Sequence, residues 1–385
     1  MDDVPSKYTS IDLFCGAGGL SEGLRMAGFD TKVGVDFEKH AMATFRENHP
    51  GAVGLLKDIA DVTGDELLEA AGCREIDLIA GGPSCQGFST HGKRLEDDPR
   101  NFLFQHFVRL VDEVQPKYVL MENVRGMVTY GKGEFLRKIR KAFWDIGYHA
   151  EVEIVCAADY GVPQLRYRVI FIATRLDQDI TFPVPTHGTG LGLQPYVTAG
   201  DALGDLPSIG TDYKNDRRPY RCHPSTDYQR YLREGAGLYV SKHVSMPLSE
   251  QASKLATYIG QGQGLRAVPV EHLPDRFKKM RRISTGELRR DCTTLYHRVD
   301  PNKPSYTITC SYRNVASGPF LHPYENRSFS HREAARIMSF PDRYKLCGLK
   351  LTRQLGNAVP PLLGKAFGLE IKKALDAHLD IRIAA

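Results

Sequence analysis

A cysteine in a glycine-rich segment is the residue of this chain best placed to do chemistry. Cys85 lies in the sequence Gly-Gly-Pro-Ser-Cys-Gln-Gly-Phe-Ser (81–89), directly after the mostly apolar run 76–80. Doubly wound α/β proteins place their active sites on loops of this kind, beyond the carboxyl ends of their strands. The thiol of Cys85 can act as a nucleophile if its pKa is lowered or an electrophile is held against it. The alternative is a free cysteine that packs as a small hydrophobe.

Two further segments carry charged side chains that suit the binding of a heterocyclic base. Glu122 follows a predicted strand at 118–121, and strands that end side by side would bring it close to the cysteine. A carboxyl group beside a heterocycle can protonate a ring nitrogen if burial raises its pKa. Arg166 and Arg168 alternate in sequence, so in an extended chain both point to one face and could hold an anion or a carbonyl oxygen. The alternative is a pair of surface arginines on an edge strand.

A glycine-rich turn near the start of the chain indicates a cofactor site. Residues 12–19 read Asp-Leu-Phe-Cys-Gly-Ala-Gly-Gly, which is not the G-x-G-x-x-G pattern, so a dinucleotide is not favoured. Asp36 ends the next predicted strand, where such folds place the acid that binds ribose hydroxyls. Asp58 and Ile59 could offer a carboxylate and an apolar side chain to an adenine ring. Together they predict an adenosine-containing cofactor without a pyrophosphate, such as S-adenosylmethionine. The alternative is a glycine turn with ordinary surface acids.

The elements that must position these residues alternate along the first half of the chain. Apolar runs of strand length and helical periodicity predict strands at 9–14, 31–35, 76–80, 118–121, 151–155 and 168–173, and helices at 20–27, 39–48, 102–114 and 134–145. This alternation indicates an α/β fold with a doubly wound, mostly parallel sheet.

Regularity is lost near Pro183 and returns at Ser330, which with Glu333 forms a helix-capping sequence. A last helix is predicted from Pro361 to about 378. We therefore predict three parts: a catalytic and cofactor-binding domain at 1–182, a smaller irregular inserted domain at 183–320, and a C-terminal part at 321–385 that returns to the catalytic domain.

Composition and charge narrow the class of protein. The eight cysteines include no Cys-x-x-Cys pair, so neither a zinc ribbon nor a disulfide scaffold is predicted, and we expect no metal. No apolar run approaches the roughly 20 residues that cross a bilayer, and the acidic N-terminus lacks a signal core, so we expect a cytoplasmic, nucleoid-associated protein without membrane contact. Residues 211–300 hold 17 Lys and Arg against 10 Asp and Glu, which favours a polyanion partner over a merely solvated face. Cationic residues are densest at Lys278, Lys279, Arg281, Arg282, Arg289 and Arg290.

Five segments in order resemble those of the C5 cytosine DNA methyltransferase family. They are residues 12–19, 82–89 around Cys85, Glu122-Asn123-Val124, 164–168, and Gly-Asn-Ala-Val-Pro-Pro at 356–361. The resemblance covers 9–175 and 320–378, and 183–320 falls where this family carries its variable target-recognition domain. One departure is Ser84, since the family usually has proline directly before the cysteine and here Pro83 lies one place earlier. Because proline fixes φ, Ser84 leaves this loop freer.

The resemblance implies a fold, a reaction and a set of site residues. The fold is that of S-adenosylmethionine-dependent methyltransferases. The reaction methylates C5 of a cytosine flipped out of a specific duplex DNA sequence, through a covalent Cys85 adduct. Glu122 would act at N3 and Arg168 at O2 of the base, while Arg166 would orient the cysteine loop or the developing charge. The final helix would pack against the first strands and complete the cofactor pocket, which is predicted to involve Phe14, Gly16, Gly18, Gly19, Asp36, Asp58, Ile59, Pro83, Leu103, Asn357 and Val359.

The expected partner is double-stranded DNA, and we expect a monomer. A cognate restriction endonuclease that acts on the same site without direct contact is a further expected partner. One alternative is an RNA cytosine C5-methyltransferase of the same fold, against which the large irregular insert favours DNA, since groove reading needs loops. The other alternative is a DNA-binding regulator without turnover, against which the four predicted catalytic residues argue.

Overall fold

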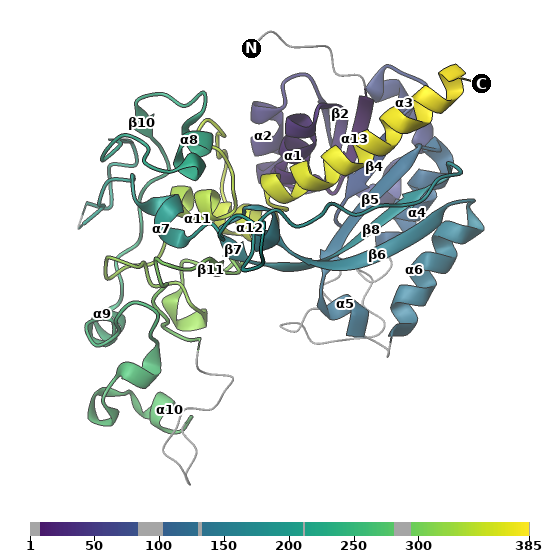
Figure 1. Ribbon diagram of the computed structural model, residues 1–385. Helices are drawn as coiled ribbons and strands as arrows, with labels where there is room; N and C mark the ends of the chain where they lie inside the picture. The colour runs from purple at the N-terminus through teal and green to yellow at the C-terminus, as the bar shows by residue number, and fades with distance from the viewer. Residues whose placement is uncertain (1–7, 84–102, 130–132, 211, 281–293, 385) are drawn as a thin grey trace.

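The computed structural model has two parts that lie side by side (Figure 1). One is a sheet flanked by helices, and the other is a second lobe with little regular structure. The structure describes residues 8–83, 103–129, 133–210, 212–280 and 294–384. Some sequence-based predictions therefore fall outside the described residues, namely those for Ser84, Cys85, Arg281, Arg282, Arg289 and Arg290.

The main sheet has seven strands in the order β3-β2-β1-β4-β5-β8-β6. Their bounds are β1 (Tyr8–Leu13), β2 (Phe29–Asp36), β3 (Val53–Leu56), β4 (Leu78–Gly81), β5 (Tyr118–Val124), β6 (His149–Cys156) and β8 (Tyr167–Thr174). The first five strands of this order pair in parallel, and β8 is antiparallel to both of its neighbours. The predicted mostly parallel, doubly wound sheet is confirmed. The edge strand β3 was not predicted, because four half-exposed residues that include a glycine give no clear period.

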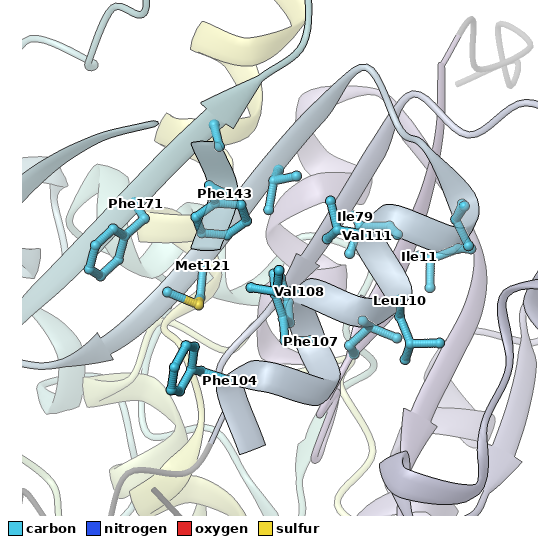
Figure 2. Packing of buried hydrophobic residues seen from close by; sticks show 14 of the residues in the cluster. Ile11, Ile79, Phe104, Phe107, Val108, Leu110, Val111, Met121, Phe143 and Phe171 are labelled. Carbon is cyan, nitrogen blue, oxygen red and sulfur yellow. The ribbon is translucent and has the colours of Figure 1, made fainter. Parts of the chain in front are cut away.

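Helices cover both faces of the sheet, because consecutive residues of the central strands β4 and β5, which point to opposite faces, are buried. On one face lie α3 (Gly64–Ala71), α4 (Leu103–Val114) and α6 (Glu134–Asp145), which bury an apolar layer against Ile79, Val119 and Met121 (Figure 2). The alternate strand residues, such as Leu78 and Leu120, pack on the other face with α1 (Gly19–Ala27) and α13 (Pro361–Ala384). The helices α2 (Lys39–Asn48) and α5 (Gly126–Thr129) follow β2 and β5.

The last helix returns to the beginning of the chain. In Figure 1, α13 crosses the sheet beside α1, and the two helices share an apolar cluster with β1. The Tyr8 hydroxyl donates to Asp376 Oδ1 at 2.7 Å. The packing is close because Gly23 of α1 has no side chain: a Cβ there would lie 2.4 Å from the Pro361 carbonyl oxygen. This confirms that the final helix packs against the first strands.

The second lobe consists mostly of loops with short elements, as the loss of periodicity after Pro183 predicted. Its elements are α7 (Ala199–Leu203), β9 (Arg218–Pro219), α8 (Asp227–Arg233), β10 (Tyr239–Val240), α9 (Glu250–Ala256), η6 (Leu265–Ala267), η7 (Val270–His272), α10 (Asp275–Lys278), β11 (Ser305–Tyr306), η9 (Val315–Ser317), α11 (His331–Ile337) and α12 (Leu351–Asn357). The strand β11 pairs in parallel with β7 (Gln164–Leu165), which leads into β8. The sheet part has two more short turns of helix, η1 (Ile59–Asp61) and η5 (Ala157–Tyr160).

Buried residues of α11 and α12 share one apolar cluster with those of α7 and α8. The predicted division of the chain at 182 and 320 stays a prediction. The predicted cap of α11 is present: Ser330 Oγ accepts from the Glu333 amide at 3.1 Å, and Glu333 Oε2 accepts from the Ser330 amide at 2.7 Å. Among the described residues, no helix is long and apolar enough to cross a membrane.

Candidate active site

The carboxyl ends of four parallel strands meet at one edge of the sheet. Leu13 at the end of β1 pairs with Val35 of β2 and with Gly81 of β4, and Gly81 pairs with Met121 of β5. The residues that follow these positions are therefore brought together at the edge where doubly wound folds bind their ligands. Sequence reasoning predicted the candidate residues at this edge, and the pairing register brings the ends of these four strands together.

Glu122 and Arg168 form an ion pair at this edge. Their strands β5 and β8 are antiparallel, and Arg168 Nε lies 2.6 Å from Glu122 Oε1. The two side chains are only 11% and 13% exposed, so the pair is largely shielded from water. Arg168 Nη1 also donates to the Tyr167 carbonyl at 2.7 Å. A guanidinium and a carboxylate held in this way present a charged, directional donor and acceptor at the sheet edge.

The segment that leads into Cys85 lies directly beside Glu122. A Cβ on Gly82 would lie 3.1 Å from Glu122 Oε2. The side-chain amide of the neighbouring Asn123 donates from Nδ2 to the Pro83 carbonyl at 2.9 Å. Pro83 is buried, and with Asn123 it fixes the start of the cysteine segment against β5. Cys85 itself lies outside the described residues, so its predicted closeness to Glu122 stays a prediction.

Arg166 is tied to two distant segments by hydrogen bonds to three of their carbonyl oxygens. Nη1 donates to Ile308 at 3.1 Å, and Nη2 donates to Gly356 at 3.1 Å and to Ala358 at 2.9 Å. The side chain is 1% exposed, and burial lowers the pKa of Arg166, as does the charge of Arg168, whereas Glu122 opposes the shift. Among the described residues, Arg166 therefore positions backbone around Asn357. Its predicted action on the cysteine loop concerns residues outside that part of the chain.

The glycine turn after β1 is tied to Asp36. The Gly16 amide donates to Asp36 Oδ2 and the Glu38 amide donates to Oδ1, both at 2.8 Å. Burial raises the pKa of Asp36, and these two hydrogen bonds oppose the rise. A Cβ on Gly16 would meet only the Phe14 carbonyl oxygen, at 4.0 Å, so space is open there. Phe14 has a φ of 63°, a strained value for a residue with a side chain, and such strain often marks a functional site.

The other two glycines of the turn are needed for packing. Gly18 has a φ of 79°, and a Cβ there would come within 2.6 Å of the Tyr344 hydroxyl. A Cβ on Gly19 would lie 2.3 Å from the Val359 carbonyl oxygen. Val359 is largely buried on this side of the turn, and exposed Asn357 lies with its Oδ1 3.1 Å from the Cys310 Sγ. The 356–361 segment is therefore adjacent to the glycine turn, as the resemblance implied.

The two predicted adenine contacts, Asp58 and Ile59, differ in their exposure. Asp58 is exposed, and its Oδ1 accepts from the Ala60 amide at 3.0 Å, so it caps η1. Ile59 is 4% exposed and belongs to the core layer of α3 and α4, and its predicted contact with adenine stays a prediction. Leu103 is half-buried at the start of α4.

Sequence reasoning missed Phe37. This residue follows Asp36 at the end of β2, and its side chain is 67% exposed. An exposed aromatic ring beside the glycine turn suits stacking on a flat heterocycle. The available signal was an aromatic residue directly after the acid that ends the strand.

Comparison with known proteins gives the family. The sequence model of the C-5 cytosine-specific DNA methylase family matches residues 8–373. The chain belongs to this family. This methylase is 35% identical over 370 residues to the type II methyltransferase M1.HphI of Haemophilus parahaemolyticus, covering 95% of this chain and 87% of the relative. It is 37% identical over 382 residues to M.XorII of Xanthomonas oryzae, covering 95% and 84%.

Solved structures agree with the fold of the methylase. The structure of a methyltransferase that was assigned to DNA modification and is encoded within a prophage (E. coli) has a TM-score of 0.75 and 27% identity, covering 96% of this chain and 100% of the other. The structure of the S. pombe Dnmt2 methyltransferase has a TM-score of 0.54 and 18% identity over 96% and 99% of the two chains, a likeness in fold alone. The protein is a DNA cytosine-5-methyltransferase, as predicted. The family and the relatives favour the predicted DNA methyltransferase over the RNA methyltransferase alternative.

Proposed function

We propose that this methylase transfers a methyl group from S-adenosylmethionine to C5 of a flipped-out cytosine, with Cys85 as the nucleophile. The observation that carries the proposal is the shielded Glu122–Arg168 pair, 2.6 Å apart at the sheet edge. It lies beside the Gly82–Pro83 backbone that leads directly into Cys85. A nucleophile next to a carboxyl group and a guanidinium is the set that a pyrimidine ring needs for activation.

In this reaction the Cys85 thiolate adds to C6 of cytosine, and the ring electrons move toward N3 and O2. Glu122 donates or shares a proton at N3, and Arg168 donates hydrogen bonds to O2, so both stabilise the charge that develops during addition. The addition makes C5 nucleophilic. After methylation a base removes the C5 proton, and the Cys85–C6 bond breaks to restore the thiolate. Since C5 and C6 are stacked within a duplex, the base must first leave the helix.

The residues around the glycine turn fit S-adenosylmethionine, which when bound supplies an electrophilic methyl group on a sulfonium. Gly16 leaves open space beside the backbone, and Asp36 offers carboxylate oxygens at the end of β2. The exposed ring of Phe37 suits an adenine, and Asp58 is exposed close to the same edge. Val359, between α12 and α13, adjoins the turn at Gly19, and Asn357 ends α12 two residues earlier. The turn lacks the dinucleotide pattern, which further supports an adenosine cofactor without a pyrophosphate.

The names of the relatives support a place in restriction and modification. Type II methyltransferases are recurrent among them, so we propose that a cognate restriction endonuclease acts on the same DNA site without contacting this protein. We further propose a monomer that acts on DNA in the nucleoid of the cytoplasm. One copy of the chain is sufficient for the proposed reaction, because the sheet edge and the second lobe belong to the same chain.

The direct test is methyl transfer by the purified chain with labelled S-adenosylmethionine on duplex DNA and on tRNA in parallel. Bisulfite sequencing of the DNA product locates the methylated cytosines. We expect labelled DNA with modification at C5 of cytosines in one recurring sequence. Label on tRNA alone, or on a DNA position other than C5, would overturn the proposal.

A further inference from the structure

A short segment after α11 packs directly on the glycine turn that follows β1. This segment, residues 340–344, reads Phe-Pro-Asp-Arg-Tyr. The Tyr344 hydroxyl donates to the Ala17 carbonyl of the turn at 2.7 Å, and Arg343 Nη2 donates to Glu22 Oε1 in α1 at 2.5 Å. The 340–344 segment therefore contacts both the glycine turn and the helix that begins after it.

A histidine from the neighbouring helix completes the contacts at the turn. His49 directly follows α2, and its Nε2 lies 3.1 Å from the Tyr344 hydroxyl oxygen and 3.3 Å from the Gly18 carbonyl oxygen. Because the Tyr344 hydroxyl donates its one proton to Ala17, His49 Nε2 must supply the proton of the contact with Tyr344. Burial lowers the pKa of His49 to about 4, so the ring is neutral at pH 7 and carries a single proton.

These polar groups are shielded from bulk water. Tyr344 is 1% exposed and His49 is 6% exposed. Burial raises the pKa of Tyr344 well above 10, which keeps its hydroxyl protonated as a donor. Removal of the hydroxyl would leave the buried Ala17 carbonyl without this donor, and such a loss costs more than the loss of a hydrogen bond that water can replace.

Buried arginines of α11 fix the backbone that carries Tyr344. Arg332 donates from Nη2 to the Tyr344 carbonyl at 3.0 Å and from Nε to the Ser241 carbonyl at 3.1 Å. Arg336 pairs with Asp342 at 2.6 Å, and both side chains are almost fully buried. The Tyr344 hydroxyl is therefore presented to the turn from a backbone that is held on its far side by the second lobe.

The turn that receives these contacts is the one that fits the cofactor. The Gly16 amide donates to Asp36 Oδ2 at 2.8 Å, and a Cβ on Gly16 would meet little else. Gly16 and Gly18 have φ values of 53° and 79°, and glycine loses more conformational freedom than any other residue when it is ordered. Contacts that fix Ala17 and Gly18 beforehand remove part of this cost from ligand binding, which raises affinity.

We propose that Tyr344, supported by His49, is a positioning residue for S-adenosylmethionine. Its hydroxyl acts through the Ala17 and Gly18 backbone, which it holds in the conformation that places the Gly16 amide against Asp36. The 340–344 segment thereby serves the cofactor site from a part of the chain that packs with the second lobe. The inference rests on the proposed function, since it assumes that the glycine turn binds S-adenosylmethionine.

The test is calorimetric titration of the purified chain with S-adenosylmethionine in the absence of DNA. Tyr344→Phe keeps the ring and removes the hydroxyl, and we expect its Kd to rise by about 3- to 12-fold, as for the loss of one buried hydrogen bond. The matched control is Tyr148→Phe, which removes a buried hydroxyl that donates to the Pro116 carbonyl at 2.5 Å, before the amino end of β5. The control should bind with the Kd of the wild-type chain.

His49 gives a second arm of the test. His49→Gln keeps a side-chain N–H donor and should retain most of the affinity, whereas His49→Leu should weaken binding as Tyr344→Phe does. Steady-state methylation adds a measurement that general loosening of the fold would not reproduce. In Tyr344→Phe, KM for S-adenosylmethionine should rise while kcat at saturating cofactor and KM for DNA change by less than about twofold.

Two results would overturn the inference without touching the proposed function. One is a Kd for Tyr344→Phe equal to that of Tyr148→Phe. The other is a rise of KM for DNA together with KM for the cofactor, which is the behaviour of a generally loosened structure. A wild-type chain that fails to bind S-adenosylmethionine would instead count against the proposed function. Urea unfolding of both tyrosine variants checks that each is fully folded during the titration.

Discussion

At the scale of single residues, we propose that Arg168 acts on the base while Glu122 holds its guanidinium. Replacing Arg168 with alanine removes a shielded charged donor, so we expect kcat to fall by about 10²- to 10³-fold, as for the loss of an oxyanion-hole donor. Single-turnover methylation measures this effect. Arg74→Ala is the matched control, since this exposed arginine precedes β4 at the opposite edge of the sheet. A kcat for Arg168→Ala within threefold of the control would contradict the role.

A second residue-scale prediction concerns Asp12, which is buried in β1 and accepts a hydrogen bond from the Ser21 hydroxyl. Burial raises the pKa of Asp12 from 3.8 to about 7. The folded state then binds more protons than the unfolded state between about pH 4 and 7, so this group's stability contribution is lost as pH rises through that window. Each pKa unit is worth about 1.4 kcal/mol. Asp12→Asn, which cannot titrate, should flatten the pH dependence of the free energy of unfolding, measured with urea, between about pH 4 and 7. An equal slope in both proteins would exclude this effect.

Sequence reasoning located some of these residues and missed others for a physical reason. The strands that carry Glu122 and Arg168 were predictable, because each has its own apolar pattern, whereas the roles of the two residues stay predictions. The partners of Arg166 were not foreseeable, since Ile308 and Ala358 are over 140 positions away and meet it only after folding. The burial of Ile59 was not foreseeable, because an apolar residue after a loop acid is equally compatible with a place in the core and with a ligand contact.

At the scale of elements, the close approach of α1 to α13 should be sensitive to a single methyl group. Gly23→Ala would place a Cβ 2.4 Å from the Pro361 carbonyl oxygen and 2.7 Å from the Lys365 amide, both backbone atoms. Overpacking of this kind costs about 1–3 kcal/mol, which chemical denaturation can measure. Gly51→Ala is the control, because a Cβ there meets nothing within 4 Å. Equal stability of the two variants would show that the helices shift freely.

The long, periodic elements were predictable and the short ones were not. The helices α4 and α6 and the last helix begin within about a residue of the positions that their apolar spacing indicated. The exposed strand β3 and the two-residue pair β7–β11 have too few residues to show a period. In the second lobe, buried contacts between distant loops replace regular elements, so a local sequence pattern cannot predict these contacts.

At the scale of the whole molecule, the charge of the second lobe predicts salt-dependent DNA binding. Residues 211–300 carry 17 basic and 10 acidic residues, and log K should fall with log salt by about 0.9 for each phosphate neutralised. Arg281 and Arg282 lie outside the described residues, and their role stays a prediction from the sequence. Replacing both with alanine should lower affinity and flatten the slope in binding titrations. An unchanged slope would place this cluster away from DNA.

Covalent trapping tests whether Cys85 is the nucleophile. A duplex that carries 5-fluorocytosine at the methylated position blocks the final elimination, because fluorine cannot leave as a proton does. With S-adenosylmethionine present, the wild-type chain should form a denaturation-resistant adduct, and peptide mapping should place it on Cys85. Cys85→Ala should give neither adduct nor methyl transfer, while it still binds the cofactor. An adduct on another cysteine, or turnover by Cys85→Ala, would contradict the account.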